Sequence, residues 1–147
     1  DELGICYYVR SSNSSYDDHG YIAIKAGVDN KRVAIAIENI MIELNKLKNE
    51  LVSKEELKKA KDFMSGGMAL GLETSDSRAD YVGFQELLKK EIKTPEEKLK
   101  LINKVTPKQV KDLANEILVE NTLNLAMIGP YKDEKEFLPL LKFKINK

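Results

Sequence analysis

The sequence has few of the residues from which self-contained catalytic and metal sites are built. Its 147 residues include one histidine, one cysteine and no tryptophan. A single cysteine, Cys6, excludes an internal disulfide and a cysteine-based zinc cluster, and it fits a reducing compartment such as the cytoplasm. We expect Cys6 to be a small strand residue and not a nucleophile.

The chain also lacks an excess of either charge and any long apolar run. Lys plus Arg and Asp plus Glu both number 24, so the formal net charge is zero. This balance gives no reason to expect nucleic acid or an anionic membrane as a partner. No apolar run approaches the roughly 18 residues that suggest a membrane span. At this length we expect one compact domain over residues 1–147.

The scarcity of histidine excludes most local catalytic arrangements. His19 lies in a polar turn beside Asp17 and Asp18, where a histidine is usually only solvated. A zinc site in this chain would need at least two ligands of other kinds. A serine–histidine–aspartate triad is not credible with one loop histidine, and no phosphate-binding glycine loop is present. The acidic run 133–136 predicts a helix start or a solvated patch. We therefore expect no catalytic residue, no metal ligand and no cofactor in this chain.

Two stretches near the beginning alternate in polarity as half-buried strands do. Residues 5–10 and 21–28 show this pattern, and the segment 11–20 between them is rich in serine, asparagine, aspartate and glycine. Because these are turn residues, the two strands are expected to form a long antiparallel hairpin. A third strand is expected at 123–128, just before Gly129.

The rest of the chain shows helical periodicity. An apolar stripe runs from Lys31 to about Asn49, and a further helix is expected from about Ser77 to Lys90. Three other helix starts carry a capping box, in which a hydroxyl side chain and a Glu or Gln three residues later bond each other's backbone. They are Ser53–Glu56, Thr94–Glu97 and Thr106–Gln109.

Glycines interrupt the first of the capped helices. Gly66, Gly67 and Gly71 would each cost roughly 1 kcal/mol in an exposed helix. They indicate either close packing against a neighbour or a kink. The apolar tail at 137–143 is expected to fold back as a short helix or an extended cover.

The order of strands and helices predicts an α+β fold with helices packed on a largely antiparallel sheet. Three strands make a thin sheet for so many amphipathic helices, so we expect further strands ahead of Asp1. Without them the sheet would have an unpaired edge, through which copies of the chain could associate.

Four segments, taken together, resemble the second, non-metal half of the insulinase/pitrilysin family of zinc peptidases, the inverzincins. No single segment is specific, but their order and spacing over nearly the whole chain are. They are residues 2–9 (ELGICYYV), 16–20 followed by 26–29 (AGVD), 53–61 (SKEELKKAK) running on to 72–73, and 105–114 closed by 125–130 (LAMIGP).

The resemblance implies half of a clam-like pair of α+β domains, fused or on two subunits. The other half would carry the H-x-x-E-H motif, which is absent here, and would supply zinc and the general base. This chain is then expected to be inactive alone and to help bind a peptide substrate. The alternative is a non-enzymatic scaffold or peptide-binding module, since some members of the family have lost the metal site.

The resemblance also implies a role for Tyr7. In the family an arginine followed seven residues later by a tyrosine faces the catalytic chamber; the tyrosine matches Tyr7, and the arginine would fall just before Asp1. The Tyr7 hydroxyl would then donate to the substrate backbone near the scissile carbonyl. Without the resemblance, Tyr7 would be interpreted as a strand aromatic packed under a helix. Tyr8 and Tyr16 keep such a structural interpretation.

Overall fold

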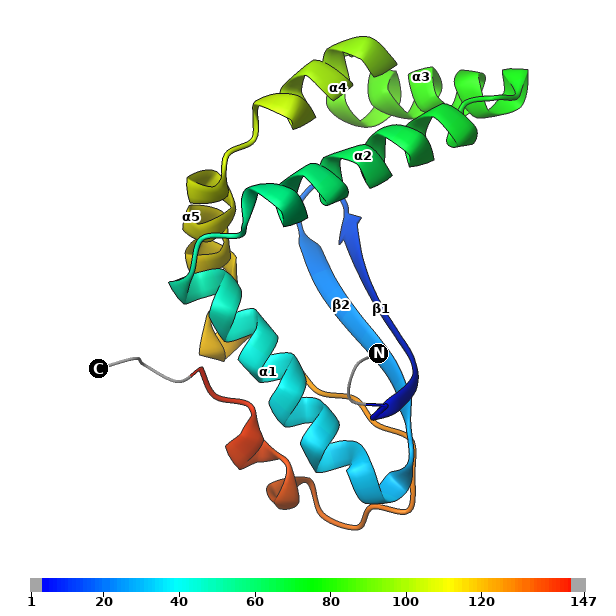
Figure 1. The fold of residues 1–147 in the computed structure, drawn as a ribbon. Helices are drawn as coiled ribbons and strands as arrows, with labels where there is room; N and C mark the ends of the chain where they lie inside the picture. Colours follow the sequence, from blue (N-terminus) through cyan, green and yellow to red (C-terminus); the bar gives the residue numbers. More distant parts are fainter. Residues whose placement is uncertain (1–3, 144–147) are drawn as a thin grey trace. The chain divides into compact units, whose positions relative to one another are not determined.

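The computed structural model describes residues 4–143, which form two strands, five α-helices and four short 3-10 helices (Figure 1). Contacts divide the chain into two compact units. We call Asp1–Glu50 with Asp112–Lys147 the hairpin unit, and Leu51–Lys111 the helical unit. A single domain over residues 1–147 stays a prediction.

The hairpin unit begins with the expected antiparallel pair, β1 (Cys6–Ser15) and β2 (Gly20–Val28). The turn is shorter than the sequence pattern predicts, and it is closed by a 2.8 Å bond from the Tyr16 N–H to the His19 carbonyl. The prediction that residues 11–15 belong to the turn is wrong, because they continue β1 and pair with β2. Serine is tolerated there because most of that stretch is solvent-exposed.

Helix α1 (Val33–Asn49) follows the hairpin, preceded by the 3-10 helix η1 (Asn30–Arg32). Three of its residues recur at every fourth position and are buried, and with Phe137 they form the core of this unit. Figure 1 shows α1 lying beside the hairpin and the C-terminal segment. The buried residues are Val33, Ile37, Met41 and Phe137, and the partly buried residues around them include Val28, Leu44, Tyr131, Leu140 and Phe143.

The C-terminal tail folds back on α1, as predicted. It forms two 3-10 helices, η3 (Glu134–Glu136) and η4 (Leu138–Leu140), and between them Phe137 is only 3% exposed. The acidic run begins a helix, since the Asp133 carboxylate accepts a 2.9 Å bond from the Lys135 N–H. The tail therefore covers the core instead of trailing from it.

The prediction of a third strand is wrong. Residues 123–128 form no strand, and within residues 4–143 the sheet consists of β1 and β2 alone. A strand requires backbone pairing as well as alternating side chains, and this segment alternates without a paired neighbour. Leu123 and Met127 still pack against the core, whereas Ile128 is fully exposed. The α+β class, with helices packed on an antiparallel sheet, is confirmed.

The helical unit contains α2 (Lys54–Gly71), α3 (Ser75–Lys89), α4 (Pro95–Lys104) and the beginning of α5 (Pro107–Ile117). All three predicted capping boxes are confirmed. Helix α3 begins two residues before the predicted start because the Thr74 hydroxyl caps it, accepting a 3.1 Å bond from the Ser77 N–H. Within residues 4–143, no helix combines the length and the apolar character needed to cross a membrane.

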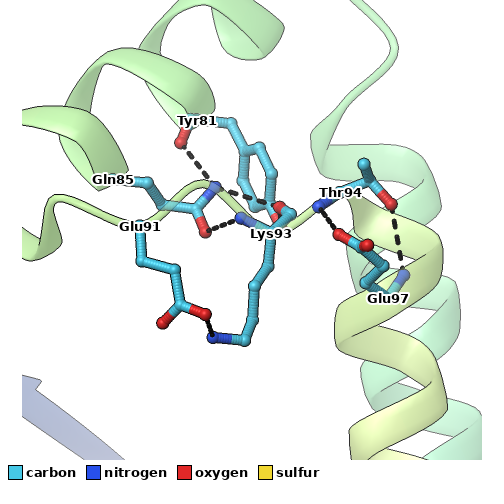
Figure 2. Close-up of polar contacts among 6 residues, drawn as sticks. All are labelled: Tyr81, Gln85, Glu91, Lys93, Thr94 and Glu97. Carbon is cyan, nitrogen blue, oxygen red and sulfur yellow. Dashed lines mark hydrogen bonds and ion pairs between the residues drawn. The ribbon is translucent and has the colours of Figure 1, made fainter.

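A buried glutamine holds the turn between α3 and α4. The Gln85 amide donates to the carbonyls of Tyr81 and Lys93, at 3.0 and 3.3 Å, and accepts a 3.2 Å bond from the Lys93 N–H. The Tyr81 hydroxyl adds a 3.0 Å bond to the Lys93 carbonyl. Figure 2 shows these bonds next to the Thr94–Glu97 capping box, so the turn and the start of α4 are fixed together.

The glycines of α2 do not mark a close contact within the described residues. An added Cβ at Gly66, Gly67 or Gly71 would meet no heavy atom within 4 Å. The helix runs through Gly66 and Gly67 without interruption and ends at Gly71. The expected close packing is therefore wrong for residues 4–143.

Candidate functional site

The pairing of β1 with β2 is irregular at Tyr7. Cys6 lies opposite Val28, but Tyr8 lies opposite Gly27, so β1 has one residue more than β2 in this stretch. Tyr7 is the extra residue, and the irregularity is a β-bulge. Bulges bend a strand and change the direction of a side chain, and they are frequent next to active sites. The uninterrupted alternation predicted for residues 5–10 is wrong at this point.

The side chain of Tyr7 lies in solvent. It is 82% exposed, so the interpretation of Tyr7 as an aromatic packed under a helix is wrong for the described chain. The backbone just before it is anchored, because the Arg32 guanidinium donates a 2.8 Å bond to the Gly4 carbonyl. Tyr7 therefore projects from a strand whose start is held against η1.

Beyond the bulge, the strands alternate regularly, and Tyr8 packs across Gly27. An added Cβ at Gly27 would collide with the ring of Tyr8, so only glycine leaves room for it. Covering a strand glycine with an aromatic ring stabilises the hairpin at a position that has no side chain of its own. Tyr8 is 61% exposed, so it is a structural residue that covers a glycine and not, as predicted, an aromatic packed under a helix.

The outward face of the hairpin contains a shallow hollow. It is lined by Tyr8, Val9, Arg10, Ser12 and Lys25. Arg10 and Lys25 are direct cross-strand partners. The sequence pattern did not single them out, because their proximity depends on the register, which the bulge and the short turn determine.

Two aromatic rings and a carboxylate lie close together at the tip of the hairpin. The Tyr16 and His19 rings stack at a centroid distance of 4.6 Å, and His19 Nδ1 lies 2.5 Å from an Asp18 carboxylate oxygen. Hydrogen bonds from Ser14 and then Tyr16 lower the pKa of the Tyr21 hydroxyl below its ordinary value.

Among residues 4–143, no three or more His, Cys, Asp or Glu side chains gather where a metal ion could be held. The described residues therefore do not fit a zinc ion.

Comparisons with known proteins point to the same family of peptidases. Residues 1–64 match the family described as Peptidase M16 inactive domain. The zinc protease YmxG of Bacillus subtilis is 32% identical over 130 residues, which are 88% of this chain and 32% of that protein. A zinc protease of Mycobacterium leprae is 29% identical over 143 residues, 97% of this chain and 32% of that protein. The chain spans about a third of the length of these two relatives.

One eukaryotic relative and one solved structure are similar to this chain as well. The alpha subunit of the mitochondrial-processing peptidase of Pongo abelii is 32% identical over 112 residues, 76% of this chain and 21% of that subunit. A chain in complex III2 from Candida albicans, bound to Inz-5, matches the fold with a TM-score of 0.71 and 21% identity, covering 78% of this chain and 28% of that one. The predicted resemblance is confirmed: residues 1–64 match the inactive domain of the M16 (insulinase/pitrilysin) family, and the relatives named here include zinc proteases and a mitochondrial-processing peptidase subunit.

Proposed function

We propose that this chain forms part of the non-catalytic half of a zinc-dependent endopeptidase and helps to enclose and bind a peptide substrate. Zinc and the general base would belong to a separate H-x-x-E-H domain, in the same polypeptide or on a partner subunit. The match of residues 1–64 to an inactive domain and the zinc proteases among the relatives support this proposal. The chain by itself is expected to be inactive.

The observation that carries the proposal is the exposure of Tyr7 on a β-bulge. Its ring is 82% exposed at the one irregular position of the hairpin. A phenol hydroxyl can donate a hydrogen bond to a carbonyl oxygen, and a donor held at a scissile carbonyl stabilises the charge that develops there. The arginine expected just before Asp1 stays a prediction.

The proposal is tested by reconstituting the chain with its H-x-x-E-H half and measuring peptide cleavage. Tyr7→Phe is expected to lower kcat about a hundredfold with a smaller change in KM, because the lost bond forms in the transition state. Tyr16→Phe is the control, since it removes a tyrosine hydroxyl at the other end of the hairpin and should leave kcat unchanged. Cleavage by this chain alone, or full activity of the Tyr7→Phe enzyme, would refute the proposal.

A non-enzymatic scaffold or peptide-binding module is the second candidate. The similar solved structure is a chain of an assembly, complex III2. The two candidates differ in what the partner domain carries. An intact H-x-x-E-H motif in the partner, with zinc bound on metal analysis, favours the peptidase; a degenerate motif favours the scaffold.

Self-association through the sheet edge is also part of the proposal. Within residues 4–143, β1 pairs on one side only, over ten residues that include a single charge. Long edge strands with few charges tend to pair with other chains. Light scattering over a range of concentrations is expected to show association, and a mass that stays monomeric at high concentration would contradict it.

A further inference from the structure

The two strands of the hairpin carry only two charged side chains, and both are cationic. Arg10 in β1 and Lys25 in β2 lie directly opposite each other. Like charges in this position destabilise a strand pair. Within residues 4–143, neither side chain has a hydrogen bond or an ion pair with another residue. The hairpin thus keeps an unfavourable pair of charges uncompensated.

The same two cations share the hollow on the outward face. Its wall also includes Ser12, whose side chain lies on the same face as Arg10 because alternate residues of a strand point the same way. Ser12 is paired with Ala23 and is solvent-exposed. Two cationic residues and one hydroxyl residue therefore line the hollow together with Tyr8.

We infer that this hollow binds the side-chain carboxylate of an acidic residue in a peptide. A guanidinium binds a carboxylate through two parallel hydrogen bonds, and an ammonium and a hydroxyl satisfy the remaining lone pairs. The bound anion would also remove the repulsion between Arg10 and Lys25. Since the whole chain has no net charge, the preference for an anion comes from this local pair.

That the ligand is a peptide rests on the proposed function. Arg10 lies three residues beyond Tyr7 along β1, a distance of about 10 Å in an extended strand. An extended peptide rises by the same amount per residue. A substrate that reaches Tyr7 would therefore place an acidic residue about three positions away in the hollow.

The test is a binding titration of the full chain with a glutamate-rich peptide and with the same peptide in which every glutamate is glutamine. The acidic peptide is expected to bind about tenfold more tightly at low salt. Arg10→Gln and Lys25→Gln should each reduce this preference. Lys59→Gln, which removes an exposed lysine of the helical unit, is the matched control and should retain it.

A second measurement separates binding from folding. Without peptide, Arg10→Gln is expected to raise the Tm by about 1–2 °C, because it removes the repulsion from Lys25. Equal binding of the two peptides would overturn the inference and leave the proposed function intact. If inorganic phosphate binds and neither peptide does, the inference of a peptide ligand is overturned and the ligand is a free anion. Full activity of the Tyr7→Phe enzyme, in contrast, would refute the proposed function itself.

Discussion

The hairpin unit and the helical unit bury different kinds of residue. In the hairpin unit the buried side chains are apolar, and they come from α1, α5 and the C-terminal tail. In the helical unit the buried residue among those described is Gln85. Several of its large apolar side chains face solvent, with Phe63, Leu70 and Leu87 at least 70% exposed, and others such as Leu57 and Leu99 are only half-buried.

This difference shows that the two units are ordered by different forces. The hairpin unit removes apolar surface from water, which is the main source of folding free energy. The helical unit satisfies the free N–H groups at its helix starts and fixes one turn through Gln85, and each such contact contributes about 1 kcal/mol. The polar contacts at the helix ends therefore matter more in the helical unit than in the hairpin unit.

The largest effect is expected from the core of the hairpin unit. Phe137→Ala should lower the free energy of unfolding by about 3–5 kcal/mol, because the ring packs on Tyr131 and on α1. Denaturant unfolding followed by circular dichroism measures the change. Leu138→Ala, which truncates a neighbouring side chain that is 52% exposed, is the control and should cost less than about 1 kcal/mol. Equal losses would contradict an apolar core here.

A smaller loss is expected from the polar contact in the helical unit. Gln85→Leu should cost about 1–3 kcal/mol, since it leaves the Lys93 N–H without its partner at the turn. Faster hydrogen exchange of the Lys93 amide would report the change locally. Glu86→Leu, at an exposed neighbour, should leave that amide protected. If Gln85→Leu instead stabilised the unit, its interior would be a conventional apolar core.

The smallest effect is a gain. Gly67→Ala should stabilise α2 by about 0.5–1 kcal/mol, because alanine is the better helix former and the added methyl meets open space. Thermal unfolding measures it. Gly27→Ala is the matched control in the hairpin unit and should destabilise, since the methyl would collide with Tyr8. Destabilisation by Gly67→Ala would mean that this face of α2 is closely packed after all.

The features that the sequence predicted correctly depend on contacts between residues close in the chain. A capping box joins residues three positions apart, so Ser53, Thr94 and Thr106 identified helix starts without knowledge of the fold. The stripe of α1 is likewise local, because it follows from the helical period. These predictions needed no tertiary information.

The features that the sequence did not predict depend on pairing. Whether residues 11–15 continue a strand is decided by their partners in β2, and whether residues 123–128 form one is decided by the absence of a paired neighbour within the described residues. The opposition of Arg10 and Lys25 follows only from the register. The candidate role of Tyr7 came from the family resemblance, and its place in a bulge came from the structure.

The bulge at Tyr7 has an evolutionary consequence. An inserted residue that is mostly exposed contributes little to the stability of the hairpin, so its side chain can be replaced without unfolding the strands on either side. Selection on this position can then act on chemistry almost independently of folding. Under the role proposed for Tyr7, a single substitution there would lower peptide cleavage while the fold persisted.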